Sequence, residues 1–170
     1  MNEVKKALDA WAKETVKQAR RNLTRNKKRA SSSLYKSLTR EVVETPYGYD
    51  VNIYGNDYAK FVDQGVSGTE RKFNTPYSYT TKQPPVSDLL PWVKRKRLRF
   101  RDAKGRFKKG DSRSMAFVVA RNIKRRGLRP TLFMTNAVMS SMKRIAPELE
   151  QAYVFEIEKL LDERIDGTTK

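Results

Sequence analysis

The sequence predicts an α+β fold, in which a small antiparallel sheet is packed by a long N-terminal helix, a central helix and a C-terminal helical region. Three observations lead to this prediction. An apolar stripe with helical spacing runs through the first 23 residues, two short strand-like runs flank a turn near residue 46, and helical periodicity returns after residue 112. A chain of 170 residues suits one domain, so we expect residues 1–170 to form a single one.

The first helix is expected from Asn2 to about Leu23. Its apolar residues recur every three to five positions and form one narrow stripe: Val4, Leu8, Trp11, Val16, Ala19 and Leu23. Such a helix either lies on the sheet or also packs on a neighbouring subunit, and the stripe fits both interpretations. Residues 21–33 are basic and polar without a stripe, which predicts a loop or a frayed helix end.

Two strands and a short turn of helix are expected next. Residues 34–44 and 49–54 have strand character, and Pro46 and Gly48 mark a turn between them, so we predict an antiparallel hairpin. Tyr58, Phe61 and Val62 then have the spacing of a single helical turn or a bent strand. Gly65 should end this segment.

Residues 66–85 are expected to form a long loop. Its aromatic residues, Phe73, Tyr77 and Tyr79, are spaced too regularly for a disordered linker, so they either anchor the loop or contact a partner. A short apolar helix should follow, with Ser87 as its cap and Pro91 in its first turn.

Residues 94–109 form a basic finger, with ten Lys or Arg residues and one acid, Asp102. Phe100 and Phe107 flank the turn signal DAKG, which predicts a small hairpin or a flexible finger. The density of charge favours a neighbouring polyanion over an ordinary solvated surface. A first basic cluster lies at Arg25, Lys27, Lys28 and Arg29. The basic residues of the finger are Lys94, Arg95, Lys96, Arg97, Arg99, Arg101, Lys104, Arg106, Lys108 and Lys109.

The central helix is expected from Ser112, as its N-cap, to Arg126. Its apolar face should consist of Met115, Ala116, Val118, Val119 and Ile123. Core packing is the ordinary role of such a face.

A sharp corner should follow the central helix. Gly127 fits the left-handed position after a helix, Pro130 prevents the helix from resuming, and Phe133 anchors the corner. A last helical region should cover 132–165, with Pro147 starting a second helix or kinking one long helix. The final DGTTK should be a frayed tail.

Composition restricts the function. The net charge of +18 points to a polyanion, most directly nucleic acid. The chain has no Cys and no His, which removes thiolate and histidine metal sites and the common catalytic triads. Its acids are scattered, so we expect no enzyme activity, cofactor or metal. No apolar run is long enough to span a membrane, and the N-terminal residues do not form a signal-peptide core.

Three segments, in this order, resemble the head–tail joining, or tail-completion, proteins of tailed bacteriophages. Residues 58–68, YAKFVDQGVSG, resemble that family's aromatic-x-x-aromatic-Val-acid-x-Gly segment after a hairpin. Residues 84–96 are similar to its Pro-rich start of a short Trp-containing helix. Residues 116–138 resemble its helix ending in Gly, followed by a Pro-x-aromatic anchor and a closing helix. The finger also resembles the RDxxGRF hairpins of phage structural proteins.

The resemblance implies a structural adaptor of the virion neck or tail top, made in the cytoplasm of a host bacterium. Such proteins form hexameric or dodecameric rings between the portal, or connector, and the tail tube, and DNA crosses the ring without base readout. It further implies that both basic clusters face the channel or the connector. The N-terminal helix with Trp11, and the loop aromatics Phe73, Tyr77 and Tyr79, would make subunit or tail contacts.

Two other interpretations remain open. A free DNA-binding protein would use the same charge, with residues 113–126 and 132–145 as a helix-turn-helix; the apolar face of the first helix and Pro130 in the link weigh against this. An RNA-binding protein is the other, although the common RNA-binding motifs are missing.

Overall fold

The computed structural model describes residues 3–25 and 33–168 and confirms the α+β class. Its contacts divide the chain into two compact units, unit 1 (Met1–Ala59 and Leu132–Lys170) and unit 2 (Lys60–Thr131). Each unit is described by itself. Whether the whole chain behaves as one domain stays a prediction.

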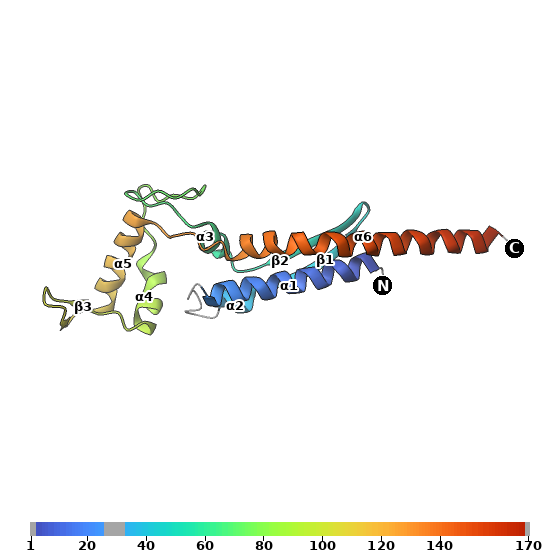
Figure 1. Ribbon diagram of the computed structural model, residues 1–170. Coiled ribbons are helices and arrows are strands. Elements are labelled where there is room, and N and C mark those ends of the chain that lie inside the picture. The colour runs from blue at the N-terminus through green and yellow to red at the C-terminus, as the bar shows by residue number, and fades with distance from the viewer. Residues whose placement is uncertain (1–2, 26–32, 169–170) are drawn as a thin grey trace. The chain divides into compact units, whose positions relative to one another are not determined.

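Unit 1 is built on two long antiparallel helices, α1 (Glu3–Arg25) and α6 (Phe133–Thr168), which lie side by side in Figure 1. Three hydrogen bonds fix their register. The Val4 N–H donates to Glu156 Oε1 at one end, the Thr15 and Ser141 hydroxyls meet at 2.8 Å, and Asn22 Nδ2 donates to the Phe133 carbonyl at 2.9 Å. The N-terminal part of α6 therefore lies against the C-terminal part of α1.

Small side chains allow these helices to approach closely. Ala12, Thr15, Ala19, Ala137 and Ser141 are at most 1% exposed, so small methyl and hydroxyl groups make up much of the buried surface of these helices. Burying polar groups without partners would be costly, and the Thr15–Ser141 bond avoids this cost. The apolar stripe of α1 was predicted, but Thr15 and Asn22 in the buried face were not.

The strand predicted for residues 34–44 is wrong in its first part. Residues Ser33–Ser37 form a short helix, α2, and the strand β1 covers Thr39–Thr45. Arg20 of α1 explains the difference, because its guanidinium donates to the carbonyls of Tyr35 (3.1 Å) and Leu38 (2.8 Å) and stacks over the Tyr35 ring. These carbonyls are thus satisfied outside a sheet ladder.

The predicted hairpin is confirmed. Strand β1 pairs antiparallel with β2 (Gly48–Tyr54), from Thr39 opposite Tyr54 to Thr45 opposite Gly48. A bidentate ion pair joins β1 to α1, with Arg40 Nε and Nη2 at 3.0 and 2.9 Å from the Asp9 carboxylate. Helix α1 therefore packs on both the hairpin and α6, whereas the sequence had suggested only the sheet or a neighbouring subunit.

Helix α6 continues through Pro147 as one element and runs to Thr168. The expectation of a second helix starting at Pro147 is therefore wrong, and so is the frayed tail at residues 166–168. Proline removes one backbone donor, but contacts with α1 lie on both sides of that gap: Ile145 (4% exposed) precedes Pro147, and Glu156, which accepts from the Val4 N–H, follows it.

Unit 2 contains α3 (Ala59–Gln64, which begins at the boundary), α4 (Val86–Arg95) and α5 (Ser112–Arg126). It also contains the short hairpin strands β3 (Phe100–Arg101) and β4 (Phe107–Lys108). The central helix, α5, packs on α4, and Val93, Ala116 and Ala120 are fully buried in unit 2.

Three details of α4 and α5 differ from the sequence prediction. Asp111, not Ser112, caps α5, since its carboxylate accepts from the backbone of Arg113 and Ser114. Val118 was predicted in the apolar face of α5 but is 48% exposed, because the side of α5 that packs on α4 is the one that carries the buried Ala116 and Ala120. Helix α4 begins at Val86 without a side-chain cap, so Pro91 lies in its second turn and not in its first.

The corner after α5 is a close crossing of two backbone segments, residues 65–68 and 125–130. Val66 and Leu128 exchange two hydrogen bonds, of 2.9 and 2.8 Å. A Cβ placed on Gly68 would lie 2.2 Å from the Arg125 carbonyl oxygen, and one on Gly127 would lie 2.2 Å from the Val66 carbonyl oxygen. The crossing therefore requires glycine on both segments.

Gly127 has the positive φ that the sequence predicted, +72°, but its ψ is −170°. This is an extended conformation that essentially only glycine adopts, rather than the left-handed helical conformation expected. The extended ψ directs the chain along residues 65–68, while the Gly127 N–H still closes α5 on the Ile123 carbonyl at 2.7 Å.

We expect Gly68→Ala to destabilise unit 2 by at least about 3 kcal/mol, because its methyl group would meet backbone atoms that cannot rotate away. Gly105→Ala is the control, since its Cβ would meet nothing within 4 Å and costs only the strain of its φ of +78°, about 1 kcal/mol. Urea unfolding followed by Trp92 fluorescence, in a Trp11→Phe background, measures both. Equal costs for the two substitutions would contradict the crossing.

Candidate polyanion-binding surface

The positive charge of the chain is concentrated in unit 2. Residues 60–131 hold 20 Lys or Arg residues against five Asp or Glu, a net charge of +15 out of the +18 of the whole chain. Half of these 20 cations lie in the finger, residues 94–109. The finger is therefore the strongest candidate for a polyanion-binding surface.

The finger starts where α4 ends. The N–H groups of Lys96 and Leu98 donate to the carbonyls of Trp92 and Val93, and Arg97 between them has a φ of +50°, which turns the chain out of the helix. Strands β3 and β4 then pair antiparallel, with Phe100 opposite Lys108 and Arg101 opposite Phe107. The hairpin predicted from the sequence is confirmed.

The Asp102 carboxylate organises the turn of this hairpin. Its Oδ1 accepts from the backbone N–H groups of Lys104 and Arg106, both at 2.9 Å, and its Oδ2 pairs with Arg106 Nε at 3.2 Å. Gly105 supplies the positive φ that the turn needs. The finger thus has a defined turn, although it carries a dense positive charge.

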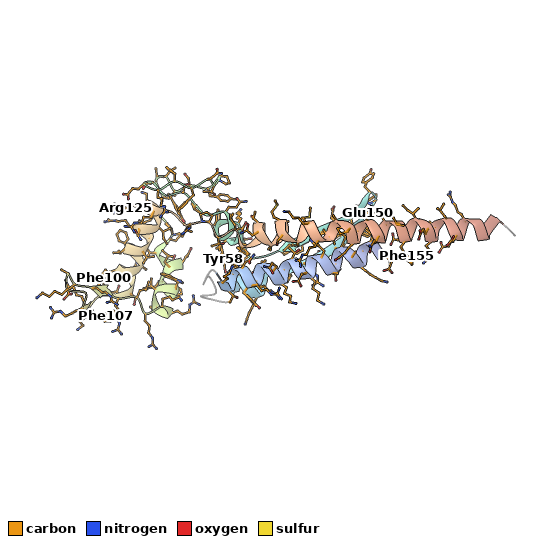
Figure 2. All side chains as sticks on the ribbon, in the orientation of Figure 1. Tyr58, Phe100, Phe107, Arg125, Glu150 and Phe155 are labelled. Atoms are coloured by element: carbon orange, nitrogen blue, oxygen red, sulfur yellow. The ribbon has the colours of Figure 1, made fainter. Side chains whose placement is uncertain are left out.

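The two aromatic residues brace the hairpin; Figure 2 labels Phe100 and Phe107. The Arg101 guanidinium lies 4.4 Å from the centre of the Phe107 ring, and the Arg99 guanidinium lies at 6.0 Å. Phe100 lies directly over Gly110, where a Cβ would come within 2.4 Å of the ring. Cation–π contacts hold the guanidinium groups in place without neutralising them.

All ten cations of the finger are exposed to solvent. Within the described part of the chain only one of them, Arg106, forms an ion pair, which leaves nine without a counter-charge. Several of them line an open groove of about 640 Å³ between the end of α4 and β4, including Lys94, Arg97, Arg99, Lys108 and Lys109. Such a surface can bind a phosphate backbone but presents no arrangement for reading bases.

The first basic cluster belongs to unit 1, apart from the finger in the division of the chain. Arg25 is exposed at the end of α1 in unit 1, and Lys27, Lys28 and Arg29 lie outside the described residues. Their predicted role stays a prediction.

The loop aromatics anchor the loop within unit 2. The Tyr77 ring meets Phe61 edge-on at 4.7 Å, and the backbones of Tyr77 and Tyr79 bond to Ser67 on both sides. Phe73 bonds to the Ser67 hydroxyl, and burial raises the pKa of Tyr79 above its ordinary value. All three rings are half-buried, so anchoring accounts for their regular spacing.

The remaining site predictions concern Trp11, Pro130 and Phe133. Trp11 is half-buried on α1, and its indole N–H is buried without an acceptor among the described residues. Pro130 packs against Gly65 at the backbone crossing of unit 2. Phe133, which was predicted to anchor the corner, is 1% exposed in unit 1, where it is the first residue of α6.

Sequence reasoning placed Asp102 in the turn signal DAKG but missed that its carboxylate accepts the backbone N–H groups of Lys104 and Arg106. The signal was present, because an Asp three residues before a Gly is typical of a turn in which the carboxylate accepts backbone N–H groups. Gly110 was also missed, since its close approach to Phe100 depends on how the hairpin folds back.

Within residues 3–25 and 33–168, no three acidic side chains gather as a metal site. None of the helices in the described ranges combines the length and apolar character needed to cross a bilayer. Comparison of the chain with protein-family models, curated proteins and solved structures gave no match. The function must therefore be argued from the surface itself.

Replacing the turn carboxylate tests whether the finger has a fixed shape. We expect Asp102→Ala to raise amide hydrogen exchange at residues 101–106 about tenfold or more, because two backbone N–H groups lose their acceptor. Asp102→Asn is the matched control, since its amide oxygen still accepts both bonds and only the ion pair is lost. Equal exchange in the two variants would show that Oδ1 does not hold the turn.

Proposed function

We propose that the chain is a structural adaptor of a tailed-phage virion, which assembles as a ring at the head–tail junction with the finger toward the DNA channel. In this role it joins the connector to the tail tube and performs no reaction. The observation that carries the proposal is the finger itself, a braced hairpin with nine exposed cations that have no counter-charge among the described residues. A ring lumen needs such a diffuse positive field and no base readout.

The backbone crossing of unit 2 also supports the proposal. Two of the three segments that resemble neck proteins, residues 58–68 and 116–138, contain the glycines that meet there. The resemblance therefore follows a physical feature of the fold rather than unrelated fragments of sequence.

The helix-turn-helix alternative receives no support from the fold. Helices α5 and α6, which it would pair, belong to different compact units, whereas that motif is a single packed unit. The charge of the finger is compatible with free DNA or RNA binding as well, so the experiments below separate that role from the adaptor.

The first experiment measures binding to a random-sequence 30-base-pair duplex over a range of salt concentrations. Replacing Arg99, Lys104 and Lys108 together by Gln should lower the steepness of the log K against log salt plot by about 2 to 3, or roughly 0.9 for each lost phosphate contact. The matched control replaces three exposed lysines of unit 1, Lys13, Lys36 and Lys143, and should change the slope by less than about 1. Equal changes would mean that total charge, and not the finger, binds the duplex.

The second experiment locates the protein in purified particles of the source phage. Mass spectrometry tests its presence, and electron micrographs of antibody-labelled particles test its position. We expect label confined to the head–tail junction. Absence from intact particles would overturn the adaptor, and the finger would then belong to a free nucleic-acid-binding protein of the infected cell.

A further inference from the structure

The C-terminal part of α6 carries an apolar face that nothing covers in the described structure. Six large side chains on residues 153–161 are between 49 and 62% exposed, and all of them except Phe155 lie on one side of the helix: Tyr153, Val154, Ile157, Leu160 and Leu161. At about 100° per residue these five fall within roughly a third of the helix circumference, so they form one continuous stripe. We call residues 153–164 the arm.

The stripe does not face α1. Ser141 and Ile145 mark the side of α6 that is buried against α1, and Glu156, which accepts from the Val4 N–H, marks the last contact. Because α1 begins at Glu3, the end of α6 extends beyond it, as Figure 1 shows. A contiguous exposed apolar stripe of this kind is typical of an interaction surface.

The charge around the stripe identifies the kind of partner. The arm contains four Asp or Glu residues and two Lys or Arg, a net charge of −2 in a chain whose net charge is +18. Glu158 and Asp162 border the stripe on one side, and Glu156 and Glu163 on the other. The arm is therefore an acidic amphipathic helix, and unit 2, with its net charge of +15, has the opposite sign.

A second copy can present its unit 2 to the arm in any orientation, whereas unit 2 of the same chain is joined to the arm through the first part of α6. Helix α6 receives the chain from unit 2 at Leu132, and Tyr153 lies about 30 Å further along the same continuous helix. A neighbouring molecule can present its basic unit to the arm without this restriction.

A groove beside α5 has the matching surface. It has a volume of about 490 Å³ and is lined by Phe100, Arg113, Phe117 and Val118, among others. Phe117 and Val118 are 43 and 48% exposed, and the Arg121 guanidinium lies 5.2 Å from the Phe117 ring centre. The groove thus has an apolar floor, with Arg113 in its lining and Arg121 beside it. Its one acid, Asp111, accepts hydrogen bonds from the backbone at the start of α5. The arm has an apolar stripe with acids at its edges.

We propose that the arm of one copy docks in the α5 groove of the next copy, as an amphipathic helix laid into an apolar groove. Arm and groove are different surfaces, so the contact is heterologous and repeats from copy to copy until a ring closes. That the copies form a ring rests on the proposed function. The docked arm adds to it the contact that joins neighbouring copies.

Engineered cysteines test the contact directly, because the chain has no native Cys. Leu161→Cys protein and Val118→Cys protein, carrying tags of different size, are mixed with oxidised glutathione and separated without reductant. We expect the mixed disulfide to form at least about tenfold faster than with Phe155→Cys in place of Leu161→Cys. Phe155 is equally exposed on the same helix but lies away from the stripe, as labelled in Figure 2.

Self-association provides the second measurement. Sedimentation of the full chain without DNA should show that Ile157→Glu weakens association about tenfold or more, while Phe155→Glu leaves it unchanged. Raising salt from 50 to 500 mM should weaken the wild-type contact as well, since opposite charges border it. Both positions are exposed, and circular dichroism checks that each variant keeps its helix content.

A monomer at all concentrations would overturn the inference, and so would equal effects of Ile157→Glu and Phe155→Glu. Preferential disulfides between two Leu161→Cys chains would also overturn it, because they would indicate that the arms pair with each other. These results are distinguishable from a failure of the adaptor proposal. Label at the head–tail junction without the arm crosslink would mean that the ring uses another contact. The crosslink without the protein in particles would mean that the copies assemble elsewhere.

Discussion

The structure of unit 2 depends on the backbone crossing between residues 65–68 and 125–130. Glycines at the crossing let the two backbones touch with no side chain between them, and Val66 and Leu128 exchange two backbone hydrogen bonds there. This contact fixes the end of α5 against the base of the long loop. The loop then closes on Ser67 through Phe73, Tyr77 and Tyr79. Because backbone atoms cannot move aside as a side chain can, the crossing restricts both segments far more strictly than an apolar contact would.

The finger shows how a chain can concentrate like charges and still keep a defined shape. Nine cations without a counter-charge repel one another, and repulsion of this kind favours an open conformation. The opposing interactions are local: the Asp102 carboxylate on the turn, Arg101 over Phe107, and Phe100 over Gly110. Among the described residues only Arg106 is paired, with Asp102, so the other nine cations keep their attraction for a polyanion while the backbone stays ordered.

Charge is also divided between the parts of the molecule. Unit 2 is strongly basic, and the end of α6 in unit 1 is acidic with an apolar stripe. A chain that carries both signs on separate surfaces is complementary to itself, which favours association of copies in a fixed order. The same division leaves the finger available for another partner, because the groove beside α5 and the groove at the end of α4 are lined by different residues. The two grooves adjoin at the β3–β4 hairpin, which contributes residues to both.

Local signals in the sequence determined the secondary structure and the candidate site: the stripe of α1, the turn at Pro46 and Gly48, the glycine stop at Gly127, and the basic hairpin around DAKG. These depend on neighbours in the chain, so composition and spacing suffice to predict them. Tertiary structure alone decided that residues 33–37 are helical and that Val118 and the stripe of the arm are exposed. Burial depends on which distant segment packs against a residue. Apolar residues have the same helical spacing whether their face packs in the core of the chain or is exposed as a binding surface.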